Sequence, residues 1–429
     1  MTADPRRSLH LRLRSAALAA ALLLLATACA DSQAGTDDEP AGPASSTPAE
    51  ADLLGPADVA SGEPVRIGLV SEGVTQAFDN TDDLRAGEAT VEYLNEHRGG
   101  IGGRPIELVT CEINGDPAGA QDCANKMVAD GVVAVTLSQS GYTDTLWRTL
   151  HAAGIPTFFT QASGADIERD AATSFVVFNP VGVFFGLPVA VAEKEEAKKI
   201  AFVVIDVPQA VEILEGDGVE ILARSGLEYE VVRVPLGTPD MTPQMQQVKD
   251  AGAEVVQVIG NDSFCIAAFR GLDAVGYEGS ITAVNQCITD ATREALPGAL
   301  GGINILTSLA VGAVGDPTYE LYRAIMAAYG PEVTDLDNVV AMGGYAAVAA
   351  LATALDDISG EVDPQSVAAA IKSMPESEYP GGGGMTYQCG GSAVPASPAV
   401  CSNQWLRTAT DPDGYPTTYT VEDSSPLFE

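Results

Sequence analysis

The stretch from Gly131 to Gly164 constrains the fold more than any other part of the chain, because it reads as a strand–loop–helix–strand–loop unit. Residues 132–137 form a short, apolar, largely β-branched run, which is typical of a buried parallel strand. Residues 142–153 carry apolar side chains at helical spacing, Gly154 ends that pattern, and residues 155–159 are apolar again. Such a unit joins two parallel strands, so the loops that follow them lie at one edge of the sheet.

Both of these loops are rich in hydroxyl groups. Residues 138–141 follow the first strand and residues 160–164 follow the second. Ligands of open α/β sheets bind at the carboxyl ends of the strands. The hydroxyls of Ser140 and Ser163, with loop N–H groups, could therefore converge on a small anion such as a carboxylate. Ordinary turn or N-cap serines would give the same pattern, so both interpretations stay open at this point.

The same alternation continues along the rest of the chain. Strand-like and helix-like segments alternate from Val65 to Phe178 and again from Val183 to Val284. Two long helical segments follow, at 317–329 and 338–358. Aromatic residues make up only 6% of the chain, and glycine and alanine are abundant, as in closely packed α/β sheets. The pattern predicts an α/β fold with doubly wound parallel sheets.

The N-terminus is typical of an exported protein. Four arginines precede an apolar run at 16–28, which is too short to span a bilayer core of about 30 Å. The run ends in Ala-Thr-Ala-Cys, which resembles a bacterial lipobox, although Leu is more usual at its first position. We expect residues 1–28 to be a lipoprotein signal peptide and Cys29 to carry lipid; ordinary secretion with cleavage beside that cysteine is the alternative. No later segment is long and apolar enough to span a membrane.

The region that follows is poor in large apolar residues. Residues 29–63 are rich in Ala, Pro, Ser, Asp and Glu, which predicts a disordered tether before a fold that starts at Pro64. The formal net charge of the whole chain is −37. Such acidity argues against nucleic-acid binding, which needs basic surfaces.

The cysteines other than Cys29 fall into local couples. These are Cys111 with Cys123, Cys265 with Cys287, and Cys389 with Cys401. An exported chain favours disulfides, and proximity makes this pairing the expected one among the fifteen that six cysteines allow. Because neither CxxC nor HxxxH spacing occurs, we expect no metal site, and no motif indicates a cofactor.

Several motifs carry a family resemblance through their order and their spacing taken together. They are Ala86-Gly87-Glu88, Tyr93-Leu94-Asn95, residues 99–109 (GGIGGRPIELV), Gly115-Asp116-Pro117, residues 123–128, Ala153-Gly154-Ile155-Pro156, Asp240-Met241-Thr242 before Val248-Lys249, and Gly344-Tyr345-Ala346-Ala347-Val348. With these segments in order, the chain resembles the type I periplasmic binding proteins of ABC transporters. The closest branch is the Leu/Ile/Val-binding (branched-chain amino acid and amide) family, and the resemblance covers about Val65 to Arg407.

The resemblance implies two doubly wound parallel-sheet lobes joined by a three-segment hinge, which close on a ligand like a clamp. Residues 64–180 and 308–400 would form the N-lobe. Residues 181–307 and 401–429 would form the C-lobe.

The resemblance also implies a ligand site. In the family, the loops after the third and fourth strands hold the ligand carboxylate and help to hold its ammonium. Ser140 and Ser163 match the hydroxyl positions of those loops, and Gln161 matches a position that usually contributes backbone. Phe78 stands where an aromatic commonly covers the ligand; a core aromatic is the alternative.

The second lobe departs from this pattern. An amino-acid binder usually supplies an acidic residue after the strand at 280–284, to pair with the ammonium. Here Asn285 follows that strand, and an amide brings no countercharge. Asp262 in the preceding loop could substitute, although it could equally be the N-cap of the helix at Phe264. Asp206 is a third, weaker candidate, so the ligand need not be an amino acid.

We therefore expect a lipid-anchored extracellular solute-binding protein. It would act as a monomer that captures an amino acid, amide or small carboxylic acid and delivers it to the permease and ATPase subunits of an ABC importer. A ligand-sensing module for a membrane receptor is the alternative. An enzyme is disfavoured, because His97 and His151 carry no metal or triad signature and Ser140 lacks a GxSxG elbow.

Overall fold

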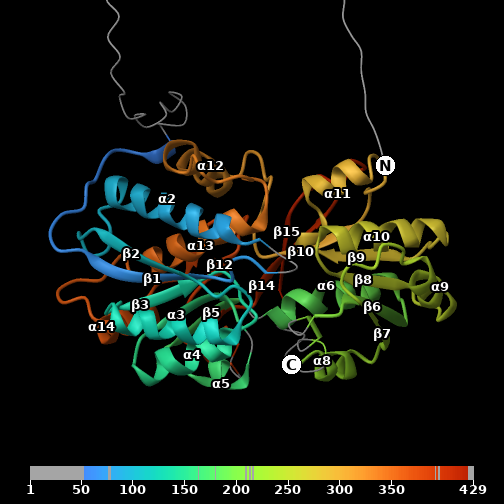
Figure 1. Ribbon diagram of the computed structural model, residues 1–429, viewed down its shortest axis with the longest axis horizontal. Coiled ribbons are helices and arrows are strands. Elements are labelled where there is room, and N and C mark those ends of the chain that lie inside the picture. The colour runs from blue at the N-terminus through green and yellow to red at the C-terminus, as the bar shows by residue number, and fades with distance from the viewer. Residues whose placement is uncertain are drawn as a thin grey trace, which may run out of the picture. The chain divides into compact units, whose positions relative to one another are not determined.

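The computed structural model describes residues 53–75, 79–162, 164–178, 180–207, 210–211, 214, 217–391, 393–394 and 397–423. The expected signal peptide, Cys29 and most of the expected tether lie outside these residues. Within the described part, no helix combines the length and the hydropathy that crossing a membrane requires. This part forms two α/β lobes, each built on its own sheet (Figure 1).

The first lobe, the N-lobe, is built on a six-stranded sheet. Its strands are β1 (Val65–Ser71), β2 (Ile106–Glu112), β3 (Ala134–Leu137), β4 (Thr157–Gln161), β5 (Ser174–Phe178) and β13 (Val400–Ser402). Its helices are α2 (Thr81–His97), α3 (Pro117–Ala129), α4 (Thr143–Ala152), α5 (Ala165–Arg169), α12 (Pro317–Tyr329), α13 (Val339–Ala354) and α14 (Pro364–Ser373). The strand order is β13-β5-β4-β3-β1-β2, and every neighbouring pair is parallel.

The second lobe, the C-lobe, has a seven-stranded sheet. Its strands are β6 (Lys199–Ile205), β7 (Glu228–Val234), β8 (Val255–Ile259), β9 (Ser280–Val284), β10 (Asn304–Thr307), β14 (Gln404–Ala409) and β15 (Thr420–Asp423). Its helices are α6 (Pro180–Glu195), α8 (Asp217–Ser225), α9 (Thr242–Asp250), α10 (Asp262–Ala274), the short 3₁₀ helix η1 (Asn285–Cys287) and α11 (Asp290–Ala295). The order is β15-β14-β10-β9-β8-β6-β7. The neighbouring strands β7, β6, β8, β9 and β10 are parallel, whereas β14 and β15 add an antiparallel edge.

The chain passes between the two sheets three times, after β5, after β10 and after β13. The predicted α/β fold of two lobes with a three-segment hinge is thus confirmed. The third passage begins slightly later than expected, because the predicted boundary between the lobes is at residue 400. Because β13 pairs in parallel with β5, the chain stays in the N-lobe as far as Ser402. A separate two-stranded sheet, β11 (Ser377–Glu378) with β12 (Thr386–Tyr387), precedes this passage.

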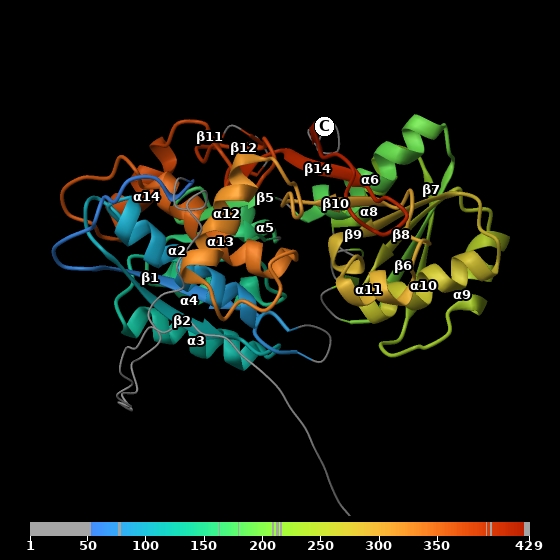
Figure 2. The same ribbon diagram turned by 90° about the horizontal axis from the view of Figure 1, so that it is seen from above.

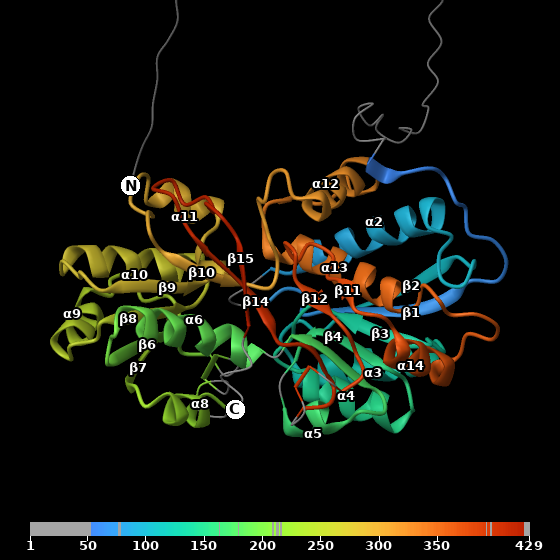
Figure 3. The ribbon, with the colours of Figure 1, turned by 180° about the vertical axis from the view of Figure 1, so that it is seen from behind.

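Helices cover both faces of each sheet, which explains why the central strands are apolar and buried, whereas the edge strand β7 is largely exposed. In the N-lobe, α2 and α13 lie on one face and α3 and α4 on the other (Figures 1 and 3). In the C-lobe, α9 and α10 lie on one side and α6 and α8 on the other (Figures 2 and 3). Every residue of β3, β5 and β8 is buried. Burial of this apolar surface, worth about 25 cal/mol per Å², stabilises both lobes.

The last part of the expected tether belongs to the folded domain, so the expectation that the tether reaches Glu63 is wrong. Leu54 is buried. The N–H of Asp58 donates to the carbonyl of Glu96 at 2.9 Å, and the N–H of Gly99 donates back to the carbonyl of Asp58 at 2.7 Å. Composition predicts whether a segment can form its own core, but not whether its backbone can satisfy the end of a neighbouring helix.

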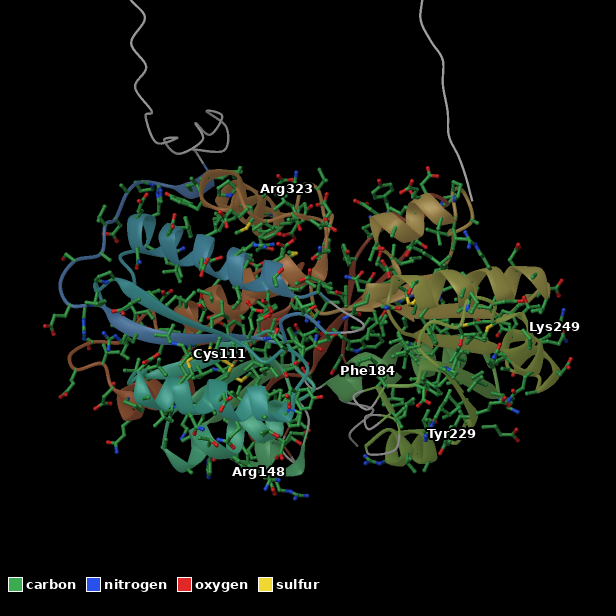
Figure 4. All side chains as sticks on the ribbon, viewed as in Figure 1. Cys111, Arg148, Phe184, Tyr229, Lys249 and Arg323 are labelled. Carbon is green, nitrogen blue, oxygen red and sulfur yellow. A yellow bond between two sulfur atoms is a disulfide. The ribbon has the colours of Figure 1, made fainter. Side chains whose placement is uncertain are left out.

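The three disulfides expected from cysteine spacing are present. Cys111–Cys123 joins β2 to α3, Cys265–Cys287 joins α10 to η1, and Cys389–Cys401 joins the segment after β12 to β13. Cys111 is labelled in Figure 4, where its sulfur lies inside the N-lobe. Each bridge closes a short loop, so the chain-entropy model gives about 3 kcal/mol of stabilisation apiece.

Candidate functional site

A cleft of about 210 Å³ is lined by loops from both lobes. The N-lobe contributes the loops that follow β1 and β3, and the C-lobe contributes the loops that follow β8 and β9. The described lining residues are Asp79, Asn80, Gln139, Asn261, Asp262, Asn285, Gln286, Ile288, Thr289, Arg293, Ile305, Val311, Asp335, Asp337, Asn338, Val339, Val340, Thr408, Thr410, Gly414, Pro416 and Tyr419. The cleft therefore lies where parallel sheets bind ligands, at the carboxyl ends of strands in each lobe.

Two of the predicted C-lobe residues, Asp262 and Asn285, line this cleft together. Asp262 is the first residue of α10, and its Oδ1 accepts the N–H of Ser263 at 2.6 Å. The N-cap is Asn261, whose side chain accepts the N–H of Phe264 at 3.1 Å, so the interpretation of Asp262 as the N-cap is wrong. Asp206, the third acidic candidate, is exposed and is absent from the described lining.

A disulfide holds these two C-lobe loops in place. Cys265 lies in the first turn of α10, three residues after Asp262, and Cys287 ends the 3₁₀ helix that Asn285 begins. Both sulfur-bearing residues are fully buried. The bridge therefore fixes the spacing between the loop after β8 and the loop after β9, which pre-organises this wall of the cleft.

Ser140 contacts a glutamate, Glu72, that the sequence interpretation missed, and Ser140, Gln161 and Glu72 are all absent from the described lining of the cleft. The Ser140 hydroxyl donates to Oε2 of Glu72, and its Oγ accepts the N–H of Tyr142 at 3.0 Å. Glu72 follows β1 directly and is only 6% exposed. Burial raises the pKa of its carboxyl, and hydrogen bonds from the Ser140 side chain and the Gly141 backbone act in the opposite direction. The sequence did contain a signal that could have identified Glu72, because a glutamate stands there directly after an apolar strand, at the edge of the sheet where ligands bind.

The remaining N-lobe candidates have different positions. Gln161 ends β4; its backbone N–H donates to the carbonyl of Ser138 at 3.1 Å, and its Nε2 donates to Oγ of Ser308 at 2.9 Å. Since Ser308 lies just after β10, Gln161 links the sheet edge to the second passage between the lobes. Ser163 and Phe78 lie outside the described residues, so their predicted roles stay predictions.

The cleft is polar, and its described lining carries more negative than positive charge. The carboxylates of Asp79, Asp262, Asp335 and Asp337 and six side-chain amides line it, against the guanidinium of Arg293. That guanidinium is bound to Asp290 at 2.8 Å. Such a lining offers many acceptors and favours a small polar ligand that brings N–H donors.

No group of three or more His, Cys, Asp or Glu side chains in the described part of the chain could hold a metal ion. The arrangement of this cleft is that of a binding site, with polar side chains from two lobes around a small volume.

The Leu/Ile/Val-binding protein homolog 6 of Brucella abortus is similar to part of this chain. It is 27% identical over 174 residues, which span 38% of this chain and 43% of the relative. The match thus spans less than half the length of that curated protein.

Solved structures share the fold over nearly all of their length. The branched-chain amino acid transporter substrate-binding protein of Streptococcus pneumoniae, in complex with isoleucine, has a TM-score of 0.66 at 15% identity and covers 84% of this chain and all of its own. A leucine-binding protein of Thermotoga maritima has a TM-score of 0.66 at 14% identity over 84% of this chain and 99% of its own. A fatty acid ABC transporter substrate-binding protein of Thermomonospora curvata has a TM-score of 0.65 at 15% identity, over 85% of this chain and 92% of its own.

These neighbours are binding proteins and not enzymes, and at such identities they establish the fold alone. The family model for periplasmic binding proteins matches residues 64–399, which span both lobes and all of the strands except β13, β14 and β15. The chain therefore belongs to the periplasmic binding protein family.

Proposed function

We propose that the protein is an extracellular solute-binding protein that captures a small polar metabolite and delivers it to an ABC importer. The observation that carries this proposal is the polar cleft lined from both lobes, within a chain that matches the family over both. Three chain passages join the lobes, so hinge closure would bury a ligand between them. Its partners would be permease and ATPase subunits, with the protein itself acting as a monomer.

The proposed ligands are an amino acid, an amide or a small carboxylic acid. A neighbour in complex with isoleucine and a neighbour named for a fatty acid have nearly the same TM-score to this chain, so the fold does not select among ligands. Specificity for a ligand must therefore come from the side chains that line the cleft. We assign ligand contacts to Asp262 and Asn285 in the C-lobe, and to Ser140, Gln161, Ser163 and Phe78 in the N-lobe.

The first test is a thermal-shift screen of amino acids, amides and small acids, followed by titration calorimetry on the best compound with Asp262→Asn and Asn285→Ala. If the ligand brings an ammonium to Asp262, Asp262→Asn should weaken binding by about 10- to 150-fold, since a charged hydrogen bond is worth roughly 1.5–3 kcal/mol. If the ligand is neutral there, Asn285→Ala should have the larger effect, about 3- to 10-fold.

Asp206→Asn is the matched control, because Asp206 is an exposed aspartate of the same lobe outside the described lining. It should leave the affinity unchanged. Unchanged affinity in both cleft variants would remove the C-lobe assignment. A screen in which no compound binds would contradict the proposed function.

We further propose that the protein is anchored at the extracellular face of the membrane through lipid on Cys29. Replacing Cys29 with serine removes the thiol to which the lipid would be attached. The variant should therefore be released into the medium, while the parent protein stays in the membrane fraction. Immunoblots of both fractions measure this, and retention of the serine variant in the membrane would refute the anchor.

A further inference from the structure

The carboxylate of Glu72 is incompletely satisfied. Its Oε2 accepts the Ser140 hydroxyl, whereas its Oε1 is buried and has no hydrogen-bond partner among the residues that the structure describes. Buried polar atoms of native proteins are rarely left without a partner, because an unsatisfied acceptor loses its hydration without compensation. An orphan acceptor on a residue that is only 6% exposed therefore requires an explanation.

Glu72 is not itself among the described lining residues, but its loop and that of Ser140 both reach the cleft. It lies in the loop after β1, which continues to the cleft residues Asp79 and Asn80. Its partner Ser140 is the next residue after Gln139, which also lines the cleft. Glu72 and Ser140 are thus held by the loops after β1 and β3, and the proposed function assigns Ser140 to the ligand.

In this arrangement the Ser140 loop presents a hydrogen-bond acceptor, whereas a donor is expected there from the sequence. A serine hydroxyl has one hydrogen to donate, and that of Ser140 goes to Glu72. A ligand carboxylate in this position would meet a glutamate rather than a free hydroxyl donor. Like charges that share a site are unfavourable, so such a ligand would be repelled.

The C-lobe wall of the cleft likewise presents a hydrogen-bond acceptor. Asp262 lines the cleft, and its described hydrogen bond is to the adjacent N–H of Ser263. The guanidinium of Arg293, which could hold a carboxylate, is already paired with Asp290. In both lobes the described lining therefore carries carboxylates, and its guanidinium is already paired.

Building on the proposed function, we infer that the ligand presents an N–H group, an amine or a primary amide, to the N-lobe, and that Glu72 is the residue that accepts it. The ligand carries no free carboxylate at this end. Glu72 is then the specificity-determining residue of the N-lobe, and Ser140 is a positioning residue that holds one of its oxygens.

The test uses matched probes on two carbon skeletons. The first set is leucinamide, 3-methylbutylamine, leucine and 4-methylpentanoate, and the second is alaninamide, ethylamine, alanine and propanoate. Each is measured by thermal shift and then by titration calorimetry with the parent protein. The amide or the amine of a set should bind at least 10-fold more tightly than the carboxylate of that set.

The best probe is then titrated into Glu72→Gln, which keeps the side-chain volume and removes the charge. Its affinity should fall by about 10- to 150-fold, the range for a charged hydrogen bond. Glu112→Gln is the matched control, because Glu112 ends the neighbouring strand β2 and is exposed. That variant should bind the probe as the parent does.

The outcomes separate the inference from the function on which it rests. Preferred binding of a carboxylate or a zwitterion by the parent protein overturns the inference and leaves the proposed function intact, whether or not Glu72→Gln folds. An unchanged affinity in a folded Glu72→Gln variant overturns the assignment of Glu72. Failure of every probe in both sets, and of the wider screen, overturns the proposed function and the inference together.

Discussion

Replacing Gly344 with alanine should lower the free energy of unfolding by at least about 3 kcal/mol, because the added methyl group has no space. Gly344 lies in α13, which packs against α2. A Cβ at this position would lie 1.9 Å from the carbonyl oxygen of Asp83 and 2.6 Å from its Cα. The obstacle is backbone in the first turn of α2, so no side-chain rotation relieves it, and the two helices must separate.

This separation should also affect the ligand site. Helix α2 begins two residues after Asp79, and α13 begins at Val339, and both of these residues line the cleft. We therefore expect Gly344→Ala to weaken ligand binding as well as to lower stability. Urea-induced unfolding followed by circular dichroism measures the stability change.

Gly343→Ala is the matched control, one residue earlier in the same helix. Its Cβ would lie 3.1 Å from Cβ of Ser138, which belongs to a loop that can shift by a few tenths of an ångström. Both variants gain the same helix propensity, about 1 kcal/mol for alanine over glycine. Gly343→Ala should therefore be close to neutral, and equal losses in the two variants would show that contact with Asp83 is not the cause.

Asp83→Asn should stabilise the protein at pH 8 by a few kcal/mol. Asp83 is only 2% exposed, and one of its oxygens, Oδ1, is buried with no hydrogen-bond partner in the described part of the chain. Burial raises the pKa of its carboxyl from 3.8 to about 8, although hydrogen bonds from the Ser71 side chain and the Leu84 backbone act in the opposite direction. An asparagine cannot ionise, so it avoids the cost of a buried charge, which is about 1.4 kcal/mol per pKa unit.

The sign of the pH dependence follows from proton binding. Between about pH 4 and pH 8, the folded state keeps the Asp83 proton and the unfolded state has released it. The unfolded state therefore binds fewer protons, and this residue makes stability fall as the pH rises through that window. The advantage of Asp83→Asn should grow from near zero at pH 4 to its full value at pH 8, as measured by urea unfolding at several pH values.

The neighbouring Asp82 provides a control of opposite sign. Burial raises the pKa of Asp82, but hydrogen bonds from Thr334, Arg85 and the Asp335 backbone outweigh it and hold the pKa below 3.8. Its contribution is present above about pH 4 and is lost as the pH falls through the lowered pKa. Asp82→Asn should thus destabilise the protein at neutral pH. The same pH profile for both variants would contradict the assignment of their charge states.

Local sequence pattern was sufficient for much of the fold. The apolar run ending at Leu137, the helical spacing that follows it and the turn at Gly154 determine β3, α4 and the start of β4, because periodicity reports which faces are buried. Cysteine spacing predicted all three disulfides, since short loops bring their ends together at low entropic cost. The position of the cleft at strand ends also follows from the predicted parallel sheets.

Contacts between segments far apart in the sequence were decided only by the tertiary structure. The sequence shows a serine at position 140 and a glutamate at position 72, but only folding brings the carboxyl ends of β3 and β1 together and gives the hydroxyl to Glu72. The antiparallel β14 and the pairing of Asp58 with Gly99 depend in the same way on distant partners. A hydrogen bond between distant residues leaves no period in the sequence, so the number of hydrogens available to a ligand at Ser140 becomes known only when its neighbours are placed.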